Sequence, residues 1–196
     1  MAKKQSDVTE TIQVPIIIDT CIILYSLSEN ESLRKQTIAF LQSLVENGYI
    51  LCINEVSYYE CLKKVNPSRQ QQFQEFLDIF HCYTIDKLNL MVGAELYTVY
   101  THHELTKSKL SMSTEDILIA STSILTSGLV LTENCSDFPM PFFDPIHKQH
   151  IVYEDKTDKL RNFYILQADY SILKDTSDEW FGSKPPIRKT SKQSTN

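Results

Sequence analysis

Glycine is scarce in this chain, with four glycines among 196 residues. No glycine-rich segment of the kind that wraps a phosphate group is present. This excludes P-loop nucleotide enzymes and proteins with a dinucleotide-binding fingerprint. The five histidines form no HExxH pattern, so the sequence shows no metalloprotease motif either.

The chain also lacks paired cysteines and long apolar runs. Its five cysteines form no CxxC pair, which argues against a zinc site or a redox motif. Their odd number and apolar settings fit a reducing compartment, so we predict a cytoplasmic protein. No apolar run approaches the length of a membrane span, and residues 1–14 lack the apolar core of a signal peptide.

A basic excess is missing as well, because the formal net charge is −6. This balance gives no electrostatic sign of nucleic-acid binding, although it does not exclude it. The basic residues form small local groups, such as Lys63 with Lys64, and each group is typical of a solvated surface. An apolar content of 42% is enough for one ordinary hydrophobic core.

The apolar pattern predicts an α/β fold. Four short runs read as strands, at 15–18, 50–53, 82–85 and 129–131, and the first two of these read as buried. Helical patterns of 3.6-residue period separate them, and this alternation predicts a parallel sheet with right-handed crossovers. We expect a fifth strand at 151–153 and a further edge strand at 163–166.

The predicted domain plan has four parts. Residues 1–14 form a flexible segment and 15–153 form the main domain. Residues 154–181 form an extension packed on that domain. The tail 182–196, which is rich in Ser, Lys, Pro and Thr, is predicted to be disordered.

Four acidic residues follow the predicted strands: Asp19, Glu60, Asp116 and Asp137. The carboxyl ends of parallel strands meet at one edge of a sheet, so these side chains should converge there. Carboxylates brought together repel one another unless they are protonated or surround a cation. Oxygen ligands of this kind suit Mg²⁺ or Mn²⁺. The sequence therefore predicts a metal-dependent phosphodiester enzyme.

Each of these residues also has a structural explanation when it is taken singly. Asp19 could cap a helix, Asp137 could belong to a turn, and Asp116 has capping-box spacing from Ser113. Asn134 is either a neutral oxygen ligand or a turn former. The combination of acids in successive strand-to-helix units favours a common site.

Two glutamates compete for the site in the helix that follows the second strand. Periodicity places Val56, Tyr59 and Leu62 on the core face of this helix and Glu60 at its margin. It does not by itself select Glu60 over Glu55. Glu55 lies in the first helical turn, where the helix dipole already accounts for a carboxylate. We therefore assign Glu60 to the site.

At this point the sequence resembles a known family, the PIN-domain ribonucleases of the VapC-toxin type. The resemblance covers roughly residues 15–153 and rests on an ordered set of segments rather than on one motif. Two positions depart from the family pattern, because Cys21 stands where Asn or Ser is common and Glu133 where a basic residue is frequent. The matching segments are 16–20, 54–60, 116–122 and 131–138.

The resemblance implies a three-layer αβα sandwich with a central parallel sheet and an endoribonuclease that uses Mg²⁺ or Mn²⁺. Asp19 and Asp116 would hold the main metal ion, and Glu60 would complete the site. Asp137 with Asn134 would hold a second ion or orient water. Thr20 and Thr132 would be supporting hydroxyls. RNA is the implied substrate, and a small antitoxin protein and a second copy of the chain are candidate partners.

Two other functions fit part of the pattern. A PIN-like module could bind RNA or a protein partner and cleave poorly or not at all. A phosphatase of the haloacid-dehalogenase type also begins with an Asp after an apolar strand. That enzyme needs a second Asp two residues later, where this chain has Cys21, and we rank it last.

Overall fold

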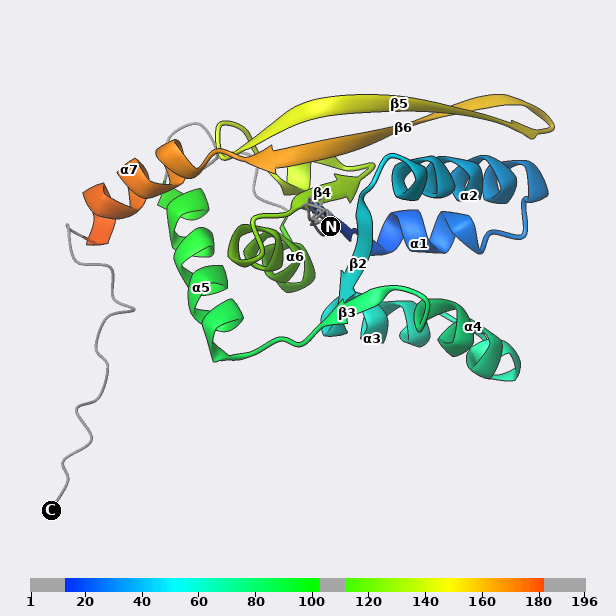
Figure 1. Ribbon diagram of the computed structural model, residues 1–196, viewed down its shortest axis with the longest axis horizontal. Helices are drawn as coiled ribbons and strands as arrows, with labels where there is room; N and C mark the ends of the chain where they lie inside the picture. The colour runs from blue at the N-terminus through cyan, green and yellow to red at the C-terminus, as the bar shows by residue number, and fades with distance from the viewer. Residues whose placement is uncertain (1–12, 103–111, 182–196) are drawn as a thin grey trace, which may run out of the picture.

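A computed structural model describes residues 13–102 and 112–181 of the chain. Its centre is a six-stranded sheet in the order β3-β2-β1-β4-β6-β5 (Figure 1). The strands β1 to β4 are parallel, whereas β6 runs antiparallel to both β4 and β5. The strand bounds are β1 Pro15–Ile18, β2 Ile50–Asn54, β3 His81–Tyr83, β4 Leu129–Thr132, β5 Phe143–Asp155 and β6 Thr157–Ala168.

Helices cover both faces of the sheet, which confirms the predicted three-layer arrangement. One face packs on α1 to α4, and the other packs on α5 to α7 (Figure 1). No helix in the described ranges is long and apolar enough to cross a membrane. The helices are α1 Thr20–Ser26, α2 Glu31–Glu46, α3 Glu55–Lys63, α4 Gln70–Leu77, α5 Lys87–His102, α6 Thr114–Leu125 and α7 Tyr170–Phe181.

The central strands are apolar throughout because both of their faces are buried. In β1, Ile16 and Ile18 pack under α1 to α4, whereas Ile17 packs on the opposite side against α5 and α6. Successive side chains of a strand point to opposite faces, so a strand between two helical layers needs apolar residues at every position. The predicted central strands are confirmed on this physical basis.

Side-chain caps set where several helices begin. The Asn54 side-chain oxygen accepts a hydrogen bond from the backbone N–H of Ser57 at 2.9 Å, and α3 starts directly after it. The carboxylate of Asp86 likewise accepts from the N–H of Leu88 at 2.8 Å at the start of α5. Such caps satisfy backbone donors that the helix itself leaves free. Asn and Asp are favoured at this position, so both caps agree with what the sequence indicates.

The C-terminal strands differ from the sequence prediction. β5 and β6 form one long antiparallel hairpin, with Lys156 at the turn at a φ of 59°. A turn this short returns the chain beside itself, so the two strands must be antiparallel. β6 lies between β4 and β5, and the segment 163–166 is therefore internal instead of an edge strand. The predicted boundary after residue 153 falls inside β5.

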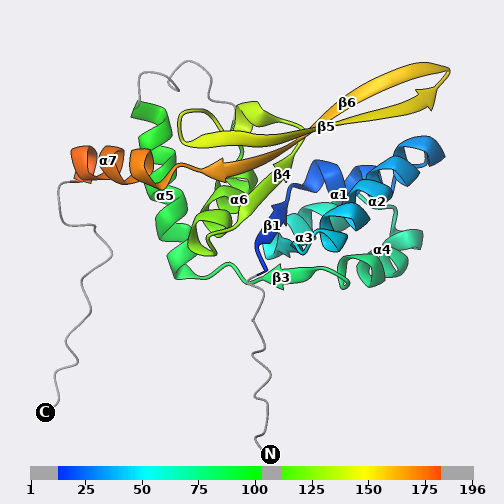
Figure 2. The same cartoon turned by 45° about the horizontal axis from the view of Figure 1, so that its top comes forward.

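The hairpin extends past the end of β4 and lies along α2 (Figure 2). Asn30, the cap of α2, donates from Nδ2 to the backbone oxygen of Glu154 at 2.8 Å. Ser32 Oγ accepts from the N–H of Glu154 at 3.2 Å. Phe163 of β6 is fully buried and stacks on Tyr25 of α1, with ring centroids 6.0 Å apart. The inner face of the hairpin is thus part of the core.

The core face of α3 also differs from the prediction. Tyr59 is 63% exposed, whereas Ser57 and Cys61 are fully buried. Residues four apart lie on one face of a helix, so these two small side chains form the stripe that lies against the rest of the core. The cap at Asn54 sets this rotation of the helix. Glu60, one residue before Cys61, lies at the margin of the buried stripe as predicted.

Candidate active site

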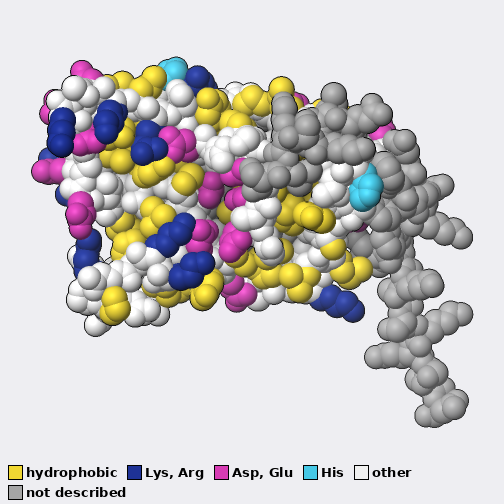
Figure 3. Space-filling view, turned by 180° about the vertical axis from the view of Figure 1, so that it is seen from behind, with side chains coloured by type: hydrophobic (Ala, Val, Ile, Leu, Met, Phe, Trp, Pro, Cys, Tyr) yellow, Lys and Arg dark blue, Asp and Glu magenta, His cyan; other side chains and the backbone are white. Residues whose placement is uncertain are grey.

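An acidic pocket of about 450 Å³ opens beside the carboxyl ends of β1 and β4. Asp and Glu side chains gather near the middle of the face shown in Figure 3, with Lys and Arg side chains beside them. The structure brings together all four acids that the sequence pointed to. The pocket is lined by Asp19, Thr20, Cys21, Leu24, Tyr25, Glu60, Lys64, Ser113, Asp116, Glu133, Asn134 and Asp137.

Asp19 lies at the bottom of this arrangement, where β1 passes into α1. Its side chain is 7% exposed and caps α1 through the N–H of Cys21. Oδ2 accepts a hydrogen bond from the hydroxyl of Thr132 at 2.6 Å and another from Cys21 Sγ at 3.2 Å. Thr132 is the last residue of β4 and is fully buried, so two neighbouring parallel strands hold this carboxylate in place.

Asp116 caps the start of α6 together with Ser113. Its N–H donates to Ser113 Oγ at 3.1 Å, and its Oδ2 accepts from the N–H and hydroxyl of Ser113 at 2.9 and 2.8 Å. This is a complete capping box, so the structural explanation considered from the sequence is real. Oδ1 takes no part in the box. Burial and the charges of Asp19 and Glu60 raise the pKa of Asp116.

Asp137 stands opposite, in the short turn Cys135–Asp137 that follows β4. Burial raises its pKa to about 6, and the negative charges of Asp116 and Asp19 act in the same direction. Asn134 Nδ2 donates to Asp137 Oδ2 at 2.6 Å, while Asn134 Oδ1 accepts from Ser136. In this arrangement Asn134 positions Asp137 and directs its own oxygen away from the carboxylate.

Glu60 reaches the pocket from α3 and forms an ion pair with Lys64 one turn later, with Nζ 2.5 Å from Oε1. Burial raises the pKa of Glu60, but the hydrogen bonds from Lys64 and Thr20 and the positive charges of Lys64 and Lys63 together outweigh it, and the pKa lies below its usual value. Lys64 is thus a pocket residue that the sequence had suggested only as part of a solvated basic group. An i,i+4 spacing of Glu and Lys was the available signal.

Glu55 lies outside the pocket. Its Oε2 accepts a hydrogen bond from the N–H of Ile85 at 3.0 Å, so it links the start of α3 to the segment after β3. The residue is exposed. The two glutamates of α3 therefore have separate structural surroundings, and only Glu60 lies with the other acids.

A second ion pair, between Glu133 and Arg161, lies at the pocket, and the sequence did not indicate this pair. Glu133 accepts two hydrogen bonds from Arg161 Nη1, at 2.9 and 2.8 Å, and a short one from the hydroxyl of Tyr25. Arg161 comes from β6, 28 residues further along the chain. Only the strand register of the hairpin brings Arg161 next to Glu133, and no local sequence pattern indicates this contact.

The types of donor atoms in the pocket suit a hard divalent cation, but their present positions do not form a finished metal site. Within the described ranges, no three His, Cys, Asp or Glu side chains already form a group that could hold a metal ion. Three of the carboxylates accept hydrogen bonds from other side chains instead. The donors are Lys64, Ser113 and Asn134. All the same, the donors are oxygens, and burial together with their mutual repulsion raises the pKa of Asp116 and Asp137. Thr20 is buried, and its hydroxyl acts on Glu60, whose pKa it lowers.

Comparison with solved structures supports the fold. The chain matches no protein-family model and no curated protein sequence. It is similar to a chain in the crystal structure of VapBC2 from Rickettsia felis bound to a promoter DNA fragment. That match has a TM-score of 0.50 and 22% identity, over 65% of this chain and 93% of the other. A toxin-antitoxin complex from Klebsiella pneumoniae matches with a TM-score of 0.49 and 18% identity, over 64% and 92% of the two chains.

The VapBC2 match supports the architecture. The three-layer PIN-like fold expected from the VapC resemblance is confirmed at the level of the fold. At such low identity the roles of individual pocket residues stay predictions.

Proposed function

We propose that this chain is a metal-dependent endoribonuclease that hydrolyses RNA phosphodiester bonds, and that it is the toxin of a type II toxin–antitoxin pair. One observation carries the proposal: Asp19, Glu60, Asp116 and Asp137 come from four separate segments and line one pocket. Burying like charges together is unfavourable unless a cation or protons offset them. A protein keeps such an arrangement at a functional site more readily than in its scaffold.

Each residue has a distinct task under this proposal. Asp19 and Asp116 would hold Mg²⁺ or Mn²⁺, with Glu60 completing the site after it separates from Lys64. Asp137, held by Asn134, would bind a second ion or orient the attacking water. Thr132 fixes the carboxylate of Asp19 through Oδ2, while among the described residues Oδ1 accepts only the N–H of Cys21 at 3.4 Å. The cation supplies Lewis acidity to the scissile phosphodiester when it is bound.

The proposal needs no covalent enzyme intermediate. The nearest thiol, Cys21, is buried and donates to Asp19, and burial raises its pKa well above the usual value. A thiol in this state is a poor nucleophile. Direct attack by water on the phosphate is therefore the reaction that these side chains support.

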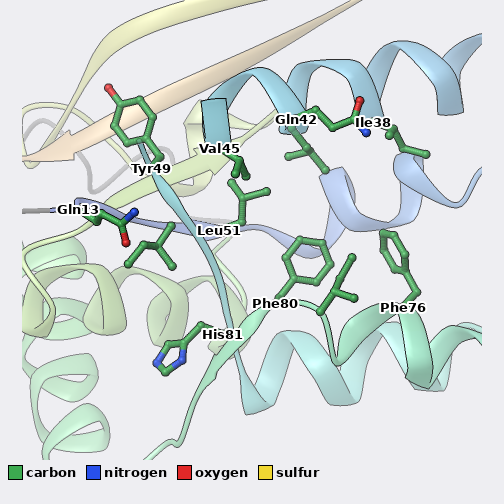
Figure 4. A pocket seen from close by; sticks show the side chains of 12 residues that line it. Gln13, Ile38, Gln42, Val45, Tyr49, Leu51, Phe76, Phe80 and His81 are labelled. Carbon is green, nitrogen blue, oxygen red and sulfur yellow. The ribbon is translucent and has the colours of Figure 1, made fainter. Parts of the chain in front are cut away.

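An antitoxin is part of the proposal, since both solved structures are named for toxin–antitoxin assemblies. A second, apolar groove lies between α2, β2 and α4 (Figure 4). Val45 and Ile79 on its rim are 54% and 71% exposed. Exposed apolar side chains in a groove suit a protein partner. The genetic test is whether a small neighbouring reading frame encodes a protein that co-purifies with this one.

A catalytically weak binding module is the second candidate. It is favoured by the ion pair between Glu60 and Lys64, which occupies one carboxylate that the nuclease would need. The two candidates differ in a single measurement. A nuclease cleaves a mixed single-stranded RNA pool when Mg²⁺ or Mn²⁺ is added and stops when the metal is chelated, whereas a binder retains the RNA intact.

Asp19→Asn is the decisive variant for the nuclease. It keeps the shape of the side chain and an N-cap, but it removes the charge that would hold the metal. We expect the cleavage rate to fall on the order of 100-fold or more, because even residues that only orient metal ligands cost 10–100-fold. The fold, followed by circular dichroism, should be kept.

Asp158→Asn is the matched control, since Asp158 is exposed near the turn of the hairpin. It should cleave RNA like the wild type. A fully active Asp19→Asn protein would refute the catalytic assignment, and an unfolded one would show that Asp19 is chiefly structural.

A further inference from the structure

Arg161 occupies a position on the inner face of β6 that would otherwise belong to the core. Side chains of a strand alternate between faces, so Arg161, Phe163 and Ile165 point to the same side. Phe163 and Ile165 are buried in the core beneath α1 and α2. Arg161 comes one step further along the hairpin, where the core ends and the acidic pocket begins. Its side chain is 30% exposed.

Aromatic rings hold the guanidinium in a defined orientation. It lies 4.2 Å from the ring centroid of Tyr25 and 5.8 Å from that of Tyr153. Tyr25 in turn stacks on Phe163 at an interplanar angle of 5°. The guanidinium therefore caps an aromatic stack, an arrangement that favours Arg over Lys because the planar group can lie on a ring.

Hydrogen bonds use only one end of this guanidinium. Nη1 donates to Tyr25 Oη at 2.8 Å and to both carboxylate oxygens of Glu133. Nε is buried without a partner among the described residues. In the same part of the chain no hydrogen bond uses Nη2, so its two N–H groups are available to a ligand.

Arg161 is also next to the acids that would carry out the reaction. Glu133 and Tyr25, which it contacts, both line the acidic pocket. The residue before Glu133 is Thr132, whose hydroxyl holds Asp19. The guanidinium is therefore connected to the carboxylate of Asp19 by its hydrogen bond to Glu133, the peptide link to Thr132 and the hydrogen bond of Thr132.

The charge of the pocket creates a need for such a cation. Five carboxyl groups line it, those of Asp19, Glu60, Asp116, Glu133 and Asp137, against the single ammonium group of Lys64. Lys64 is paired with Glu60. An RNA phosphate that approaches this surface is repelled unless a neighbouring cation offsets the charge. A guanidinium with free N–H groups donates strong, charge-assisted hydrogen bonds to phosphate oxygens.

We propose that Arg161, delivered by the β5–β6 hairpin, is the phosphate-binding residue at the mouth of the acidic pocket, and that Glu133 and Tyr25 orient it toward an RNA phosphate beside the cleaved bond. The inference rests on the proposed function, because it names a contact of that same site with its substrate. Arg161 binds and positions RNA in this scheme, and it takes no part in proton transfer.

The competing account is that the Arg161–Glu133 pair only fastens the hairpin. Under that account Arg161→Gln and Glu133→Gln break the same pair and should act alike on RNA. Under the proposal Arg161→Gln weakens RNA binding much more than Glu133→Gln does. Arg161→Gln removes the phosphate contact, whereas Glu133→Gln keeps the cation, removes one repelling charge and leaves an amide oxygen that can still accept from Arg161.

The experiment measures binding of a single-stranded RNA oligonucleotide at several salt concentrations, in the presence of a metal chelator that stops cleavage. Cleavage of the same RNA with the metal present is measured beside it. We expect Arg161→Gln to weaken binding about tenfold, the usual scale for one charged hydrogen-bonded contact. The slope of log affinity against log salt should fall by about 0.7, as for one lost contact to a single strand.

Charge alone must be separated from contact. The matched controls are Lys159→Gln and Asp155→Asn, which break an ion pair of the same hairpin away from the pocket. They should leave affinity within about twofold, because exposed pairs contribute little. Arg161→Lys keeps the charge without the planar fork, and it should recover only part of the affinity. A raised KM with a nearly unchanged kcat is expected for Arg161→Gln.

Three results would overturn the inference. The first is that Arg161→Gln binds RNA as well as Lys159→Gln does. The second is that Arg161→Gln and Glu133→Gln weaken binding equally. In both cases a wild-type protein that binds and cleaves RNA leaves the proposed function standing. If the wild type neither binds nor cleaves RNA, the proposed function fails and the inference fails with it.

Discussion

Individual residues in the pocket combine stability with candidate chemistry. Asp116 completes a capping box with one oxygen, and Asp19 caps α1 while it accepts from Thr132. A carboxylate that already satisfies backbone donors is rigid, and rigidity is what a preorganised ligand set requires. The structural and functional explanations of these acids, which compete when only the sequence is known, are compatible in the folded chain.

The two glutamates of α3 give a prediction at this scale. Glu60→Gln should weaken Mn²⁺ binding and slow cleavage strongly, because it removes a pocket carboxylate. Glu55→Gln should leave cleavage nearly unchanged and reduce stability by on the order of 1 kcal/mol or less, a dipole contribution. The measurements are Mn²⁺ titration and cleavage rate for both variants. Normal cleavage by Glu60→Gln together with an inactive Glu55→Gln would reverse the assignment.

Elements rather than single residues set the direction in which these side chains point. The phase of α3 is one example, since the cap at Asn54 turns Ser57 and Cys61 inward and leaves Glu60 at the rim. The capping box of α6 is another. It starts the helix at Thr114 and thereby places Asp116 in the first turn, at the mouth of the pocket.

Ser113→Ala tests this role of the α6 cap. Loss of the cap should lower the free energy of unfolding by about 1 kcal/mol, within a usual range of roughly 0.5–2 kcal/mol. Cleavage should slow as well, because the hydroxyl bond to Asp116 Oδ2 disappears together with the bond from the N–H of Asp116 to Ser113 Oγ. Urea unfolding and cleavage rates measure the two effects. Ser113→Thr should restore most of both, since Thr also caps helices.

Ser43→Ala is a suitable control for the same measurements. The hydroxyl of Ser43 bonds to the carbonyl of Phe40 within α2 and caps no helix start. We expect a change of less than about 0.5 kcal/mol. If Ser113→Ala is equally silent in stability and cleavage, the box does not position Asp116.

At the scale of the whole molecule, a cation bound in the acidic pocket should raise the free energy of unfolding. A cation that binds only the folded pocket stabilises the protein by about 2.7 kcal/mol at 100 times its Kd. For a chain of this size that corresponds to a rise in Tm of roughly 5–10 °C. Thermal unfolding of metal-free protein with and without Mg²⁺ or Mn²⁺ measures the effect. The double variant Asp19→Asn with Asp116→Asn should lose it.

The stabilisation should also depend on pH. Asp137 has a folded pKa of about 6 against an ordinary value of 3.8, so the metal-free folded state holds an extra proton between these two pH values. Metal binding must displace that proton. The metal-induced rise in Tm should therefore be larger at pH 7.5 than at pH 5. A rise that is the same at both pH values would place the cation away from Asp137.

The sequence by itself determined the elements that depend on near neighbours. The central strands, the caps at Asn54 and Asp86, and the acids after the parallel strands were all predictable. Periodicity and capping act within about four residues. The convergence of Asp19 and Asp137 followed as well, because β1 and β4 are neighbouring parallel strands that end at one edge of the sheet, whereas Asp116 lies in a helix that follows α5.

Only the tertiary structure decided the rest. The hairpin became internal to the sheet through pairing of β6 with β4, and the rotation of α3 exposed Tyr59. Arg161 meets Glu133 and Tyr25 across 28 and 136 residues of chain. Such contacts depend on strand register and helix packing, and a one-residue slip would turn Arg161 to the other face of the sheet. Local patterns carry no information about that register, so the cation beside the acidic pocket was found only in the folded molecule.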